Sequence, residues 1–355
     1  MTKPKLSPAA LICLLLCARS FTTMTLFPVG ITGGLTYMTG AVISTVLQIF
    51  LLIPAVKLAA RTRKDPCTLA FERGKNFGRA TTLAFLLYFL YEAFRDIGDL
   101  AYFTDYFFAV NMTRIMTVLC VVLTAVYAAR LRISVLGRTA RITFAGVIIM
   151  LAVIAAGAAE DMDITRFDYA VNDLPAELSK AVYAEFSRCE CLALFSFLAA
   201  DIDGDPEKTA KFYLIAKGAM ITLIAGMVTS VLGTFAFAEK LPVFTLAAAS
   251  ENLITERSDA VFLIIWVMTG IVKLTTLLYC SARCLRLLRP KDSDIGSVFL
   301  AGLIPTAAAL PLLLVYGWEK VIYSPRPAAP IIILGLILPA YLLHVSPKSA
   351  HEREV

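Results

Sequence analysis

Long apolar runs recur along this chain and constrain its fold more than any other feature. A bilayer core of about 30 Å requires about 20 apolar residues in each transmembrane helix. The chain is 59% hydrophobic and 17% charged, with a mean hydropathy of +0.76. A soluble domain is about 45–50% apolar. We therefore expect an all-α integral membrane protein, and we exclude a soluble metabolic enzyme, a secreted disulfide scaffold and a disordered regulator.

About ten segments have the length and composition of transmembrane helices. They are 9–28, 34–56, 80–108, 114–129, 142–159, 184–202, 212–238, 258–282, 296–317 and 328–346. If the N-terminus is cytoplasmic, roughly three times as many Lys and Arg residues fall in inner segments as in outer loops, as the positive-inside rule requires. We therefore expect both termini in the cytoplasm. The net charge of +6 is then a topology signal and not a nucleic-acid surface.

The order of the runs predicts a single membrane domain over 1–355, made of two halves. The acidic outer loop 160–183 separates the five-helix segments 9–159 and 184–346, and a cytoplasmic tail follows at 347–355. Because five is odd, the second half enters the membrane from the opposite side. Inverted repeats of this kind are typical of a transporter-like fold with its substrate site near mid-membrane.

Four charged residues lie near the middle of the third run. Glu92, Arg95, Asp96 and Asp99 are spaced i, i+3, i+4 and i+7, so they share one helical stripe. Ionisable side chains deep in a bilayer cost about 2.5–3.5 kcal/mol and therefore face a partner or a cavity. Arg95 can pair with Glu92 and Asp99. The stripe is either a self-neutralised cluster that locks helix packing or a site for a cation, a proton or an amino group.

The eighth run carries a matching stripe. Trp266, Thr269 and Lys273 recur at helical spacing, and Lys273 lies too deep to reach the interface comfortably. We expect Lys273 to neutralise an acidic residue of the third run or to meet an anionic substrate group. Thr269 is a candidate substrate contact.

The first and sixth runs supply further candidates. The hydroxyl-rich segment that includes Thr22 and Thr23 predicts an interrupted helix, and Arg19 could bind a carboxylate. The sixth run carries Arg188 and Glu190. Glu190 is either a site residue or, with Arg188, part of a charge pair at the outer interface.

The remaining charges have weaker interpretations. Lys217 is interpreted as snorkelling to the interface, whereas Glu256, Arg257 and Asp259 are expected to act as gate or structural caps of the eighth run. We find no nucleophile paired with a base, no phosphate-binding motif and no metal-ligand spacing. The sequence therefore predicts neither an enzyme, nor a cofactor, nor a metal site.

Part of the second half resembles a known family. The stretch Pro242–Leu246, the segment 254–266 ending in Trp266, and Lys273 are similar to the spore germination permease family, the B-type subunits of nutrient germinant receptors. Segments 6–28 and 186–197 agree more weakly. The chain departs from the family's glycines at 20–23 and at 188–189, and the resemblance implies that these two regions are unwound and contact the ligand.

The resemblance implies an amino-acid/polyamine/organocation-type fold that recognises a small nutrient such as an amino acid. It implies an A-type membrane subunit and a C-type lipoprotein as partners, in the spore inner membrane. The alternative is a proton- or cation-coupled amino-acid transporter that uses the third-run carboxylates as its coupling site. A scaffold with an inactive site is the third possibility.

Overall fold

A bundle of long helices forms the protein. The computed structural model describes residues 6–27, 31, 33–108, 111–169, 172–250, 258–290, 293–314 and 326–345, and within these ranges the chain is helical without any β-strand. Seven helical segments in the described part are long and apolar enough to cross a membrane. The number of spans, ten, and the inverted repeat stay predictions.

The helices occur in the following order along the chain. They are α1 (Pro8–Thr25), α2 (Gly34–Thr62), α3 (Pro66–Arg73), α4 (Lys75–Phe108), α5 (Asn111–Ala129), α6 (Ile133–Gly157), α7 (Leu174–Phe186), α8 (Cys191–Leu198), α9 (Pro206–Leu232), α10 (Pro242–Ala249), α11 (Ser258–Leu288), α12 (Asp294–Leu313), α14 (Ala328–Ile332) and α15 (Leu338–Val345). The short helices η1 (Ile164–Arg166), η2 (Ala199–Asp201) and η3 (Gly233–Phe237) lie in the connections between the longer ones. The short helix η4 (Ile333–Ile337) joins α14 to α15, so that Ala328–Val345 is one continuous helical segment.

The helix starts follow from local sequence. Ser7, Asp65, Asp205 and Ser293 each accept a backbone N–H as the N-cap of the next helix, and proline occupies the first positions of α1, α3 and α9. These residues satisfy amides that would otherwise lack a partner, and proline has no amide to satisfy there. The polar caps therefore stop and restart the apolar helices.

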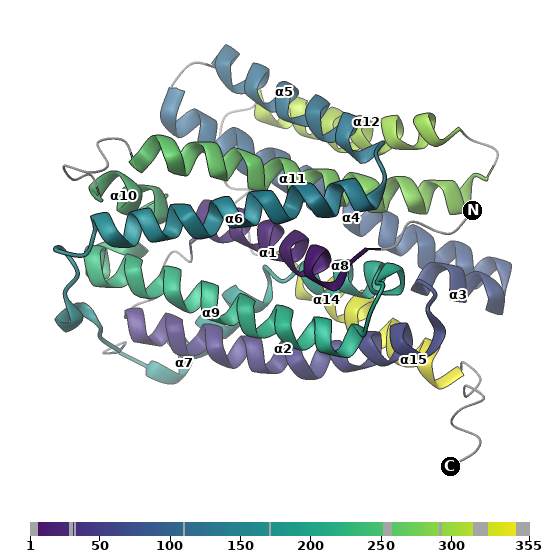
Figure 1. Ribbon diagram of the computed structural model, residues 1–355, viewed down its shortest axis with the longest axis horizontal. Coiled ribbons are helices and arrows are strands. Elements are labelled where there is room, and N and C mark those ends of the chain that lie inside the picture. Colours follow the sequence, from purple (N-terminus) through teal and green to yellow (C-terminus); the bar gives the residue numbers. More distant parts are fainter. Residues whose placement is uncertain are drawn as a thin grey trace.

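Helices α1 and α8 lie in the middle of the bundle (Figure 1). In the view of the figure, α4, α5, α6, α11 and α12 lie on one side of them and α2, α7, α9 and α15 on the other. Both central helices are buried along nearly their whole length. Arg19 of α1 and Glu190, the residue that precedes α8, are therefore removed from solvent and from lipid alike.

Both ends of the described chain lie at the same end of the bundle. Leu6 pairs with Asp201 and Asp203 through backbone hydrogen bonds of 2.8 Å, while Arg73 of α3 donates to the carbonyl of Val345. Figure 1 shows α3 and α15 together at this end and α10 at the other. The side of the membrane that each end faces stays a prediction.

Three details differ from the sequence expectations. The expected sixth run, 184–202, is not one helix, because the chain breaks over residues 187–190 between α7 and α8. The acidic connection is shorter than 160–183, since α7 already begins at Leu174. The expected interruption in the first run is wrong as far as Thr25, because α1 is continuous from Pro8.

The hydroxyls of α1 explain its continuity. Ser20, Thr23 and Thr25 each donate to the carbonyl four residues earlier, at 2.7–3.0 Å. Such bonds satisfy a hydroxyl inside an apolar environment without opening the helix. A row of hydroxyls therefore does not require a broken backbone.

Candidate functional site

The break between α7 and α8 is the centre of the candidate site. Residues 187–190 form a turn in which Cys189 N donates to Phe186 O at 3.1 Å, and Glu190 is the N-cap residue of α8. A broken helix exposes a negative dipole end and a positive dipole end inside the protein. Charged side chains meet both ends here.

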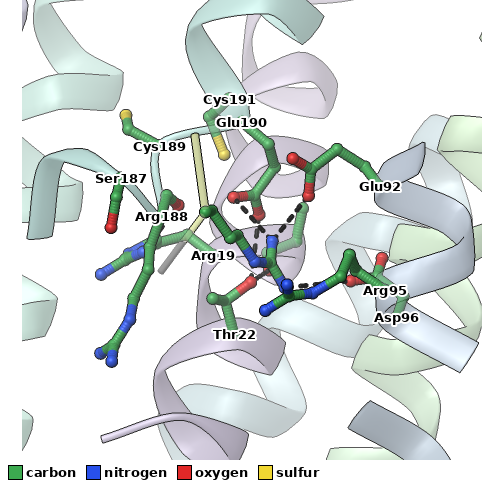
Figure 2. A network of polar contacts seen from close by, with 12 residues as sticks. Arg19, Thr22, Glu92, Arg95, Asp96, Ser187, Arg188, Cys189, Glu190 and Cys191 are labelled. Atoms are coloured by element: carbon green, nitrogen blue, oxygen red, sulfur yellow. Dashed lines mark hydrogen bonds and ion pairs between the residues drawn. The ribbon is translucent and has the colours of Figure 1, made fainter. Parts of the chain in front are cut away.

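The first group of charges, the Glu190 cluster, lies on the α8 side of the break. It consists of Thr22, Glu92, Asp96, Asp99, Glu190, Lys273 and Arg326. No member exposes more than 3% of its surface. The members lie on α1, α4 and α11, at the N-cap of α8 (Glu190) and just before α14 (Arg326). Segments that are distant in sequence therefore meet at one point. In Figure 2, the carboxylates of Glu92 and Glu190 turn toward a shared centre while the Arg188 side chain runs away from it.

Lys273 is held by three oxygen atoms. Its Nζ lies 2.7 Å from Asp96 Oδ1, 2.7 Å from Thr22 Oγ1 and 3.0 Å from Glu190 Oε1. Thr22 Oγ1 in turn donates to Glu190 Oε1 at 3.0 Å. An ammonium has three donors, so the coordination of Lys273 is complete. The expectation that Lys273 neutralises an acidic residue of the third run is confirmed.

Arg326 bridges two turns of α4. Its Nη1 lies 2.7 Å from Glu92 Oε2, and its Nη2 lies 3.0 Å from Asp99 Oδ2. Asp96 and Glu190 are next, at 3.8 and 3.7 Å. Arg326 Nε has no hydrogen-bond partner among the described residues.

The second group, the Glu185 cluster, lies on the α7 side of the break. It consists of Arg19, Gln48, Glu185, Cys189 and Lys217. Arg19 bonds to Glu185 and donates to the carbonyl of Arg188 at 2.8 Å, while Lys217 Nζ lies 3.3 Å from Glu185 Oε1 and donates to Gln48. Cys189 Sγ lies 2.7 Å from Gln48 Oε1.

The two clusters carry opposite excess charge. In the Glu190 cluster four carboxylates face two cations, or three when the nearby Arg95 is included, whereas in the Glu185 cluster one carboxylate faces two cations. A cation beside the α7 C-terminus and a carboxylate at the α8 N-terminus also match the helix dipoles. The break therefore separates a carboxylate-rich side from a cation-rich side.

Packing of α1, α4 and α11 fixes this arrangement. A Cβ at Gly270 would lie 2.8 Å from the ring of Phe21, so glycine one turn before Lys273 lets α11 approach α1 closely. Trp266 donates to Thr25 Oγ1 at 2.8 Å and stacks on Phe103 of α4 with centroids 3.8 Å apart. Tight contacts on one side of the cluster thus limit how far its charges can move apart.

The residues expected at the site have different positions. Glu92, Asp96, Asp99, Glu190, Lys273 and Thr22 come together in the Glu190 cluster. Arg95 is buried on the same stripe, with Nη1 3.5 Å from Tyr91 Oη. Arg19 belongs to the Glu185 cluster.

Other expected residues lie away from the charges or outside the described part. Thr23 and Thr269 donate to carbonyls of their own helices. Asp259 accepts from Ala260 N in the first turn of α11, at 2.7 Å. Glu256 and Arg257 fall outside the described residues.

Two residues were interpreted incorrectly from sequence, and two were missed. Lys217 does not snorkel, because it is fully buried against Glu185. Arg326 lies between the expected segments 296–317 and 328–346, so the topology argument counts it as an outer-loop charge, but it is buried in the Glu190 cluster. Glu185 and Gln48 were not singled out, although each is a polar residue at a helical position that is fully buried.

A third ionic group occurs at the end of the bundle that holds α3. This Arg283 cluster consists of Arg283, Asp65 and Asp201: Arg283 Nη2 lies 2.8 Å from Asp65 Oδ2, and Nη1 bonds to Asp201. The three residues line a pocket of about 490 Å³, together with Arg63, Lys64, Thr68, Ala200, Ile202, Asp203 and Gly204. Arg283 and Asp201 expose 17% and 11% of their side chains, whereas Asp65 is buried.

No group of three His, Cys, Asp or Glu side chains within the described ranges is arranged to hold a metal ion. No model of a known protein family matches the chain, and no curated protein matches it either.

Proposed function

We propose that this chain is a permease-like receptor subunit of the membrane that binds a small zwitterionic nutrient, such as an amino acid, at the helix break. The amino group binds on the side of the Glu190 cluster, and the carboxylate binds on the side of the Glu185 cluster. The observation that carries the proposal is the opposite charge excess of the two clusters across residues 187–190.

The charge pattern supports a zwitterion over a simple ion. An amino acid carries one positive and one negative group a few ångströms apart, and a site with a carboxylate-rich half and a cation-rich half complements both. The helix ends offset part of each excess, because the positive α8 N-terminus lies on the carboxylate-rich side and the negative α7 C-terminus lies on the cation-rich side. Burial strengthens each of these interactions because the local dielectric is low.

The helix packing supports a transporter-like inverted repeat. If the two halves are repeats, α2 corresponds to α9, α4 to α11 and α5 to α12. The contact of α4 with α12 is then matched by the contact of α11 with α5. Helix α2 also packs on its counterpart α9, and α4 packs on its counterpart α11. Two halves related by a pseudo-twofold axis in the membrane plane would produce these matched contacts. The ligand site then lies between the halves.

The wider assignment rests on the resemblance of Pro242–Leu246, 254–266 and Lys273 to the spore germination permeases. Under it, the chain works with an A-type membrane subunit and a C-type lipoprotein in the spore inner membrane, with both termini in the cytoplasm. Ligand binding would shift the equilibrium between two conformations, and the partner subunits would respond to that shift.

A binding measurement tests the proposal. We expect one of the twenty labelled amino acids to bind the purified full-length protein in lipid nanodiscs. Glu190→Gln and Arg19→Gln should each weaken that binding by about tenfold or more, since each removes one charge–charge contact worth about 1.4 kcal/mol or more. Lys64→Ala, which removes an exposed charge, is the control. Absence of binding by the whole panel, or binding that survives both substitutions unchanged, would contradict the proposal.

A proton- or cation-coupled transporter is the second candidate, favoured by the carboxylate excess of the Glu190 cluster. Proteoliposomes separate the two functions. A receptor subunit should bind the ligand without accumulating it, whereas a coupled transporter should accumulate it against its gradient when a proton or sodium gradient is imposed. Asp96→Asn should then abolish accumulation.

A further inference from the structure

Arg326 differs from the other cations of the Glu190 cluster in how it is attached. Arg326 and Pro327 are not helical, and they directly precede α14, whose first turn lies near the middle of the long axis of the bundle (Figure 1). The ion-pair partners of Arg326 among the described residues are Glu190 and carboxylates of α4. Arg326 can therefore leave the carboxylates without unwinding a helix that carries them.

The coordination of Arg326 is also less complete than that of Lys273. Lys273 has three oxygen atoms within 3.0 Å for its three donors. Among the described residues, Arg326 makes two short contacts with its five donors, and its Nε has no partner there. On the acceptor side, Asp96 Oδ2, Asp99 Oδ1 and Glu190 Oε2 are buried without a hydrogen-bond partner within the described part of the chain. The carboxylates thus have acceptor capacity that Arg326 does not use.

The geometry of the two short contacts selects a type of cation. Glu92 Oε2 and Asp99 Oδ2 accept from different terminal nitrogens of a single planar group. A guanidinium presents a fixed fork of donors to two carboxylates, whereas a single ammonium is a point charge that does not reproduce the fork. A ligand that takes this position needs the same planar arrangement.

We propose that Arg326 is an internal ligand of the Glu190 cluster, and that the external ligand is a small molecule with a guanidinium group that binds by replacing it. The inference rests on the proposed function, because it names the ligand class for the same site. The structure then represents the self-occupied state, and release of Arg326 is the conformational consequence of binding.

Competition makes a directional prediction. When one of the protein's own side chains occupies a site, an external ligand binds only while the site is free. The apparent affinity is therefore the intrinsic affinity multiplied by the fraction of time for which the site is free. With Arg326 in place for nine-tenths of the time or more, Arg326→Ala should bind agmatine and arginine about tenfold tighter than the wild type. Alanine, which has no guanidinium, should show no such gain.

The experiment is equilibrium binding of labelled agmatine, arginine and alanine to full-length protein in nanodiscs. Arg283→Ala is the matched control, because Arg283 is also a guanidinium between two carboxylates but lies at the end of the bundle. We expect tighter agmatine binding in Arg326→Ala, its loss in the double variant Arg326→Ala/Glu92→Gln, and wild-type affinity in Arg283→Ala. If Arg326→Ala fails to fold, Arg326→Gln serves instead, with the same expected order.

The failures of the two proposals are distinguishable. Equal agmatine affinity in the wild type and in the folded Arg326 variants would overturn the inference about Arg326. In that case, binding of alanine or another neutral amino acid that Glu190→Gln weakens would still support the proposed function. A gain that persists in the double variant would also overturn the inference, because the added ligand would then bind elsewhere.

Discussion

Two guanidinium groups in this protein make similar contacts in different environments. Arg326 bridges Glu92 and Asp99 at the centre of the bundle with 2% of its side chain exposed, whereas Arg283 bridges Asp65 and Asp201 beside a pocket with 17% exposed. Around Arg326 the carboxylates outnumber the cations. Around Arg283, water can reach the partners through the pocket.

The difference shows how environment decides what an ion pair does. A charge near the surface keeps part of its hydration, so its pairing adds little and its loss is tolerated. A buried charge has lost its hydration and depends on its partners, so removal of one partner leaves the other uncompensated. We therefore interpret the Arg283 cluster as a structural contact between α3, η2 and α11, and the Glu190 cluster as the part that responds to added charge.

The largest effect is expected when Lys273 is removed. Lys273→Met leaves Asp96 and Glu190 without their nearest cation, and breaking a buried pair in this way costs about 3–5 kcal/mol. Chemical denaturation of the detergent-solubilised protein measures the loss of stability. The double variant Lys273→Met/Asp96→Asn should recover part of it, because one buried negative charge is removed as well.

The outcome that contradicts this reading is a small effect. If Lys273→Met destabilised the protein no more than a surface substitution, the carboxylates would not depend on Lys273. A double variant less stable than the single one would show instead that Asp96 stabilises the protein through contacts other than that with Lys273.

Sequence periodicity predicted the α4 stripe correctly because i, i+3, i+4 and i+7 positions share a helix face regardless of tertiary context. Lys273 followed from the same reasoning, since a cation deep in an apolar run needs an anion. Only the family resemblance marked 188–189 as a region expected to unwind. Composition did not predict the break at 187–190, because Ser187, Arg188, Cys189 and Glu190 include neither glycine nor proline, the residues that usually mark a helix end. Its stability comes from charges on other helices.

Arg326 and Lys217 show a second limit of prediction from sequence. Periodicity places a residue on a face but does not specify how deep it lies or which helix faces it. Both residues are near the ends of apolar runs, where snorkelling and topology signals are the common explanations. Only the fold brings Arg326 to Glu92, more than two hundred residues earlier in the chain.

A smaller effect is expected at the Arg283 cluster. Arg283→Gln removes charge-assisted hydrogen bonds to Asp65 and Asp201, worth about 1.5–3 kcal/mol in a buried setting and less where water replaces them. Because Cys67 of α3 and Cys284 of α11 are both buried next to these residues, loosening of α3 should raise their labelling by a maleimide. The experiment uses a Cys120→Ser background, since Cys120 is exposed.

Ligand binding is the second measurement on this variant. Arg283→Gln should leave amino-acid affinity at the wild-type level, because its cluster is separate from the break. A loss of affinity equal to that of Glu190→Gln would remove the distinction between the two regions. Unchanged thiol labelling would show that Arg283 does not hold α3 against α11.

The smallest effect is expected at the exposed pair of Lys64 and Glu72, whose atoms lie 2.6 Å apart with about half of each side chain in solvent. Lys64→Ala should change stability by about 0–1 kcal/mol, because water and salt screen a pair of this kind. Raising the salt concentration should lower the stability of the wild type toward that of the variant and leave the effect of Lys273→Met nearly unchanged. If salt reduced both effects equally, solvent ions would reach the centre of the bundle, and burial could not explain why Lys273 and Lys64 differ.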